Sequence, residues 1–87
     1  MEQLKIIIKD EANKTMFENF IKAQAESLSL KGYVKIVDDG DIRIEAQGDG
    51  KDLIELVDQC KSGLGKHKVI VKSVNIKEKY TTFEVKH

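Results

Sequence analysis

Residues 33–46 read YVKIVDDGDIRIEA, two strand-like runs joined by a short polar turn. Its two ends, 33–37 and 42–46, are rich in the β-branched residues Val and Ile, which are typical of strands. The four residues between them include Asp39-Gly40, and an Asp-Gly pair supplies the positive φ that a tight hairpin requires. The sequence therefore predicts a β-hairpin near the middle of the chain.

An amphipathic helix is predicted on each side of this hairpin. From Thr15 to Ser29, apolar residues recur at steps of three and four, and polar residues such as Glu18 take the other side. A second helix is predicted around Leu53–Cys60, because glycines bracket a stretch with the same period. The apolar stripes are Met16, Phe17, Phe20, Ile21, Ala25 and Leu28 in the first helix, and Leu53, Leu56, Val57 and Cys60 in the second.

Strand-like runs occupy the two ends of the chain. Leu4, Ile6 and Ile8 alternate with lysines, and two further runs, 69–76 and 80–85, flank a polar turn at 77–79. The order is βαββαβ, which predicts an α+β ferredoxin-like sandwich: an antiparallel sheet with two helices on one face. A chain of 87 residues has room for one domain, so we expect residues 1–87 to form a single unit.

The composition argues against several classes of function. Fifteen basic and fifteen acidic residues cancel, so the overall charge steers the chain toward neither nucleic acid nor membrane. The longest apolar runs, such as Ile6-Ile7-Ile8, are far too short to span a bilayer. The N-terminus lacks the apolar segment of a signal peptide, and we expect a cytoplasmic protein.

Cysteine and histidine are too few for a cofactor or metal site. Cys60 is the only cysteine, which excludes an internal disulfide and a multi-cysteine metal centre. It falls in an apolar helical stripe, so we expect a buried, inert thiol. With only His67 and His87 beside it, we expect no metal and no cofactor.

The spacing of turns and apolar residues resembles that of the acylphosphatase family. Members of that family read Ala-x-x-Leu-x-Leu-x-Gly, then an aromatic residue, then Val-x-Asn-x-x-Asp-Gly-x-Val. This chain follows the pattern without a gap from Ala25 to Ile42, and the resemblance extends from Phe17 to Val85. It implies the same ferredoxin-like fold. The matching positions are Ala25, Leu28, Leu30, Gly32, Tyr33, Val34, Asp39, Gly40, Ile42, Gly48, Phe83 and Val85.

The functional part of the family pattern is a loop, Gly-x-Val-Gln-Gly-Val-x-Phe-Arg, between the first strand and the first helix. The resemblance implies that its N–H groups cradle a phosphate, that its arginine binds the phosphoryl oxygens, and that an asparagine on the second strand positions water. Here Glu18 takes the place of the arginine and Ile36 that of the asparagine. The loop corresponds to Asp10, Glu11, Ala12, Asn13, Lys14, Thr15 and Met16.

These replacements predict the loss of catalysis. A carboxylate repels a phosphate by on the order of 4 kcal/mol per pair of unit charges near a surface. Ile36 has no group that can bind water, and the two loop glycines fall on Asp10 and Lys14. We therefore expect an inactive acylphosphatase-like domain that acts, if at all, as a binding or structural module.

Two alternatives stay open. An acylphosphatase that hydrolyses the carboxyl-phosphate bond of acyl phosphates through an altered site would need another cation, and Lys14 and Arg43 are the candidates. A structural or designed single domain with no ligand fits the sequence equally well. The expected partner is therefore an unknown protein or small ligand, and we expect a monomer.

Nucleic-acid binding is disfavoured by the strands themselves. RNA-recognition domains share the βαββαβ order but stack bases on aromatic residues of their first and third strands, where this chain has none. Lys5, Lys9 and Arg43 are expected to share one exposed face of the sheet, most simply as a solvated surface. The Asp38–Asp41 turn lacks the remaining ligands of a calcium loop.

Overall fold

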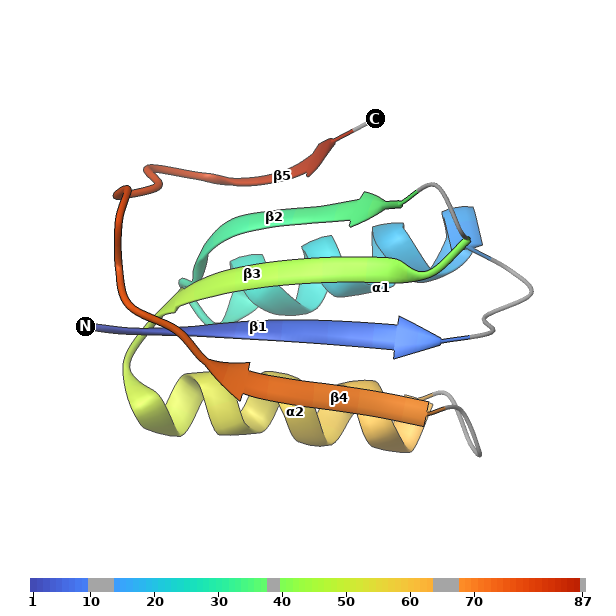
Figure 1. Ribbon diagram of the computed structural model, residues 1–87, viewed down its shortest axis with the longest axis horizontal. Coiled ribbons are helices and arrows are strands. Elements are labelled where there is room, and N and C mark those ends of the chain that lie inside the picture. Colours follow the sequence, from blue (N-terminus) through green and yellow to red (C-terminus); the bar gives the residue numbers. More distant parts are fainter. Residues whose placement is uncertain (10–13, 38–39, 64–67, 87) are drawn as a thin grey trace.

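A five-stranded sheet with both helices packed on one face makes up the molecule (Figure 1). The computed structural model describes residues 1–9, 14–37, 40–63 and 68–86. Neither helix in these ranges is long and apolar enough to cross a membrane. The elements are β1 (Glu2–Lys9), α1 (Lys14–Ser27), β2 (Lys31–Ile36), β3 (Ile42–Gly48), α2 (Gly50–Gly63), β4 (Lys68–Ser73) and β5 (Phe83–Lys86).

The strand order is β4-β1-β3-β2-β5, which confirms the predicted ferredoxin-like fold. The first four strands pair antiparallel, with Ile6 opposite Ile44 and Val34 opposite Ile44 on the two sides of β3. The expectation of an entirely antiparallel sheet is wrong at one edge, because β5 pairs parallel to β2. The chain has to travel from β4 at one edge to β5 at the other, and it arrives running in the direction of β2 (Figure 1).

The core lies between the helices and one face of the sheet. The strands contribute alternate residues, as their period of two predicts, and the helices contribute the stripes with helical period. Cys60 is fully buried in this layer, as predicted. The fully buried members of the core are Ile6, Ile8, Ile21, Ala25, Val34, Ile42, Ile44, Ala46, Leu56 and Cys60.

Helix α1 differs from its prediction on both faces. Met16 is 66% exposed rather than part of the core, since it lies in the first turn on the outer side. Glu18, expected on the solvent side, is 2% exposed. The helix also ends at Ser27, because Ser29 adopts φ 59° and the N–H groups of Ser29 and Leu30 donate to carbonyls of the last turn.

The end of the chain is less regular than predicted. Residues 74–82, which we call the crossover segment, carry neither of the expected strand extensions at 74–76 and 80–82. The segment crosses the end of the sheet to reach β5, so it forms no continuous ladder with a strand (Figure 1). Val74 N–H donates to the Gln3 carbonyl at 3.1 Å, which fixes the start of the segment.

The predicted hairpin is confirmed, and its packing depends on Gly32. Strands β2 and β3 pair from Lys31 opposite Gln47 to Ile36 opposite Ile42, and Gly40 has φ 89° in the connection. Gly32 has φ 141°, and a Cβ atom built there would lie 1.8 Å from the Glu45 carbonyl oxygen. Only a residue without a side chain lets the two strands approach this closely.

Gly32→Ala should lower the free energy of unfolding by about 3 kcal/mol, because the methyl group meets backbone rather than a movable side chain. Urea denaturation of purified protein measures this. Gly50→Ala is the matched control, since its methyl group meets only the exposed Glu2 side chain and Ala favours the start of α2. Equal stability of the two variants would contradict the steric role of Gly32.

Candidate functional site

Glu18 is the charged residue that the structure places most unexpectedly. It lies one turn into α1 on the same side as Ile21 and Ala25, and only 2% of its surface is exposed. Its Oε2 atom is buried and has no hydrogen-bond partner. A buried carboxylate oxygen without a donor lowers stability and presents negative charge at the start of the helix.

Ile36 lies at the same end of the molecule as Glu18. It is the last residue of β2, and Figure 1 shows that β2 ends beside the beginning of α1. Its side chain is half-buried, packs against the core and lies opposite Ile42 of β3. An aliphatic side chain offers a water molecule neither donor nor acceptor.

The remaining predicted loop residues fall partly outside the described structure. Asp10, Glu11, Ala12 and Asn13 lie outside the described residues. Lys14 is the first residue of α1, but its side chain also lies outside the described part. Thr15 and Met16 occupy the first turn with exposed side chains.

Neither Arg43 nor Lys9 replaces the family arginine. Arg43 projects from the face of β3 opposite the helices, because its neighbours Ile42 and Ile44 point into the core. It therefore lies across the sheet from Glu18. Lys9 shares that outer face, where its Nζ lies 2.9 Å from Asp41 Oδ2.

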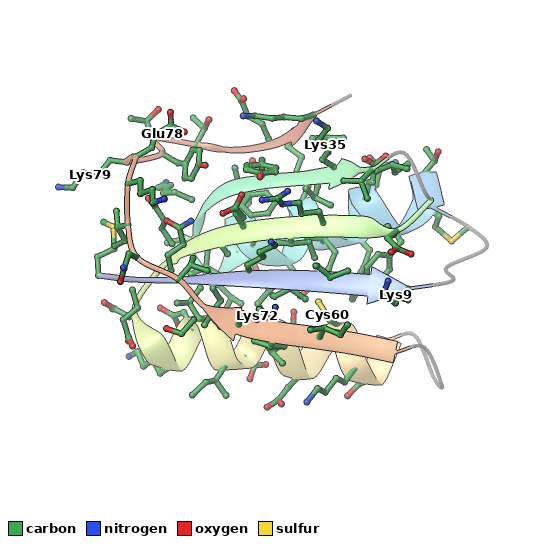
Figure 2. The ribbon with its side chains drawn as sticks, viewed as in Figure 1. Lys9, Lys35, Cys60, Lys72, Glu78 and Lys79 are labelled. Carbon is green, nitrogen blue, oxygen red and sulfur yellow. The ribbon has the colours of Figure 1, made fainter. Side chains whose placement is uncertain are left out.

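The sheet face turned away from the helices is the second polar region, and we call it the open face. Lys5, Lys9 and Arg43 share it, as predicted, because the residues between them fill the core. Figure 2 shows Lys9, Lys35 and Lys72 on this side. The register places Lys72 directly opposite Lys5.

Two buried glutamines on the open face hold the crossover segment. Gln47 is fully buried, and its amide donates to Gln3 Oε1 at 2.8 Å and to the Glu78 carbonyl. Its own oxygen accepts from Tyr80 N–H at 3.1 Å. Gln3 donates in turn to Glu45 Oε1 at 3.1 Å. This network could not be predicted from the sequence, since a glutamine on a strand usually faces solvent and Gln3 and Gln47 lie on different strands.

Tyr33 completes the network from β2. Its hydroxyl donates to Glu45 Oε2, and its ring meets the Tyr80 ring edge-on at 5.8 Å between centroids. Lys86 lies 4.6 Å from the Tyr33 ring centroid, in a cation–π contact. Burial, followed by the bond to Glu45, raises the pKa of Tyr33 from 10.0 to about 12.

The described residues offer little for other chemistry. Burial raises the pKa of the Cys60 thiol to about 12, so it carries no thiolate near neutral pH. Within the described ranges, no three His, Cys, Asp or Glu side chains converge as a metal-ligand set.

Comparison with known proteins identifies the family of this chain. The family model for acylphosphatase matches residues 4–85, so the chain belongs to the acylphosphatase family. Among curated relatives, the acylphosphatase of Thermotoga maritima is 31% identical over 91 residues, covering 100% of this chain and 99% of its own. The acylphosphatase of Oceanobacillus iheyensis is 29% identical over 92 residues, with full coverage of both.

Solved structures agree with the fold. The crystal structure of acylphosphatase from Bacillus subtilis superposes with a TM-score of 0.88 at 27% identity, and the match covers 100% of both chains. An acylphosphatase from Coxiella burnetii gives a TM-score of 0.85 at 22% identity, over 98% of this chain and 92% of that one.

Glu18→Met should raise the free energy of unfolding by about 1–3 kcal/mol, because it replaces an unpartnered buried carboxylate by an apolar group of similar size. Denaturant titration compares it with wild type. Glu26→Met, on the exposed side of the same helix, is the control and should change stability by less than about 0.5 kcal/mol. Loss of stability in Glu18→Met would show that Glu18 has a structural partner.

Stability should fall with alkaline pH partly because of Tyr33. The folded protein keeps the phenol proton up to about pH 12, whereas the unfolded chain loses it near pH 10.0. The folded state then binds more protons, so stability is fully present below pH 10.0 and declines as pH rises through about 12.

Tyr33→Phe should therefore be less stable than wild type at pH 8 but lose less between pH 9 and pH 12. Urea midpoints at several pH values measure the two slopes. Cys60 contributes to the slope of both proteins, so only the difference is informative. Identical slopes would contradict the elevated pKa of Tyr33.

Proposed function

We propose that this domain is a non-catalytic acylphosphatase-like module that keeps the family scaffold and has lost the phosphate site. The observation that supports this most directly is Glu18, a buried carboxylate with an unpartnered oxygen at the position that the resemblance assigns to the phosphate-binding arginine. The module then acts by binding a protein or small ligand elsewhere, as a monomer.

Electrostatic repulsion from Glu18 opposes substrate binding, the step that precedes any chemistry. A phosphoryl group that approaches the start of α1 meets the Glu18 carboxylate instead of the planar, doubly donating guanidinium. Because the carboxylate is withdrawn from water, solvent screens this repulsion poorly. The favourable field of the helix N-terminus, about half a unit charge, is smaller than the full charge of Glu18.

The attacking water also lacks the side chain that would orient it. Ile36 packs against the core at the end of β2 and provides no hydrogen bond. Removing one well-placed hydrogen-bonding group from a catalytic site typically costs about 10²–10³ in rate. Together with the repulsion at Glu18, this leaves neither a bound substrate nor an oriented nucleophile.

A hydrolase with an altered site is the alternative. It is supported by the curated relatives, which bear the name acylphosphatase and match over their full length. In that case Lys14, at the start of α1, would take the role of the arginine.

Wild-type protein incubated with benzoyl phosphate should release benzoate no faster than buffer does. The double variant Glu18→Arg with Ile36→Asn should gain measurable affinity for inorganic phosphate by isothermal titration, since it restores the charge and the amide. Full activity is not expected, because the loop glycines are still missing. Glu26→Arg with Ile36→Asn carries the same charge change on the exposed side of α1 and should gain none.

The hydrolysis assay and the phosphate titration test different parts of the proposal. Wild-type hydrolysis above buffer that Lys14→Gln abolishes would overturn the proposal in favour of the altered-site enzyme. No gain of phosphate binding in the Glu18→Arg double variant, if it is folded, would place the lost site elsewhere.

A further inference from the structure

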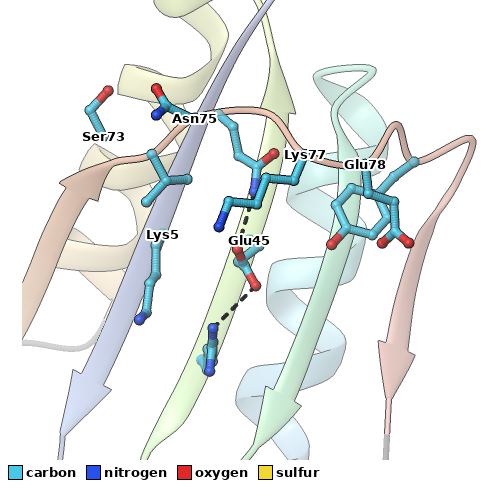
Figure 3. Close-up of a pocket in the computed structure, with 10 residues that line it drawn as sticks. Lys5, Glu45, Ser73, Asn75, Lys77 and Glu78 are labelled. Atoms are coloured by element: carbon cyan, nitrogen blue, oxygen red, sulfur yellow. Dashed lines mark hydrogen bonds and ion pairs between the residues drawn. The ribbon is translucent and has the colours of Figure 1, made fainter.

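We propose that the open face carries an anion-binding site, unrelated to the family's phosphate loop, that takes a small molecule with several oxyanion groups, such as a phosphate ester or a polycarboxylate. It lies in a cavity of about 820 Å³ under the crossover segment (Figure 3). This volume is within the usual range of small-ligand pockets, roughly 300–1,000 Å³. The site does not depend on whether the domain hydrolyses acyl phosphates.

The cavity is built from elements that the polar network holds in place. Lys5 comes from β1, Arg43 and Glu45 come from β3, and Asn75 and Lys77 come from the crossover segment. The bonds from Gln47 to the Glu78 carbonyl and from Tyr80 N–H to Gln47 fasten that segment to the sheet. The wall that carries Lys77 is therefore positioned before a ligand arrives.

Cations outnumber carboxylates in the lining of this cavity, since Lys5, Arg43 and Lys77 face Glu45 and Glu78. In the described part of the chain, Lys5 and Lys77 have no carboxylate within ion-pair distance. Figure 3 shows Lys5 on β1 and Lys77 on the crossover segment, with Glu45 on β3 between these elements. Lys72, opposite Lys5, adds positive charge to the field at the rim.

Arg43 has unused hydrogen-bonding capacity. Its Nε–H is buried without an acceptor, and its Nη2 reaches Glu45 Oε2 only at 3.4 Å. Glu45 is meanwhile occupied by shorter bonds from Gln3 and Tyr33. A guanidinium that is weakly held on one side can turn its fork of donors to an incoming oxyanion.

The chemistry of the lining selects the kind of ligand. Lysine and arginine donate only, and Asn75 and Ser73 add neutral polar groups, so acceptor-rich oxyanions fit and apolar molecules do not. Recognition of unpaired RNA bases on the sheet would require exposed aromatic rings for stacking. Tyr33 is buried, and its ring is covered by Lys86 and met edge-on by Tyr80.

Isothermal titration with inorganic pyrophosphate and, separately, with citrate tests the proposal and distinguishes phosphate from carboxylate recognition. At least one should bind wild type saturably at low ionic strength. Lys5→Gln with Lys77→Gln should weaken that binding at least tenfold, and Arg43→Gln alone should weaken it several-fold. The control is Lys51→Gln with Lys61→Gln, which removes the same charge from the exposed side of α2 and should leave affinity unchanged.

The outcomes separate this site from the phosphate loop. Saturable binding lost only in the cavity variants supports the site, whether or not benzoyl phosphate is hydrolysed. The proposal is overturned if neither anion binds or if both double variants lose affinity equally. It is also overturned if Lys14→Gln abolishes binding while the cavity variants retain it.

Discussion

The alternation of side chains along β3 fixes both the core and the polar face of the sheet. Ile42, Ile44 and Ala46 point to the helices and are fully buried, so the central strand closes the core. The residues between them point the other way and carry all the polar contacts of that strand. A slip of one residue in register would exchange the two sets, placing an arginine, a glutamate and a glutamine in the core. The close approach of β2 at Gly32 keeps that register, because only glycine fits there.

The two faces of the sheet differ in how their buried carboxylates are partnered. On the helix side, Glu18 near the start of α1 is buried without a partner for one oxygen. On the open face, Glu45 is surrounded by donors from three strands and cations remain in excess. This contrast underlies both proposals: a lost phosphate site at the start of α1 and an anion site on the open face.

Much of the fold was predictable from local patterns, and much of the polar chemistry was not. The hairpin followed from Asp39-Gly40 between two β-branched runs, and the helices followed from their period. Glu18 was predicted on the solvent side, because a carboxylate on an amphipathic helix is normally solvated. Its burial depends on tertiary packing, which residue type does not reveal. The parallel pairing of β5 and the contacts of Gln47 join residues far apart in the chain. Such non-local contacts leave no periodic signal.

The proposed loss of the family's phosphate site at the start of α1 can be followed residue by residue. The experiment is a titration of ¹⁵N-labelled protein with inorganic phosphate, followed by amide resonances. The account predicts that the amides of Thr15, Phe17 and Glu18 do not move, and that shifts concentrate at Lys5, Arg43 and Lys77. Saturable shifts at the first turn of α1, unchanged by Lys5→Gln with Lys77→Gln, would contradict it.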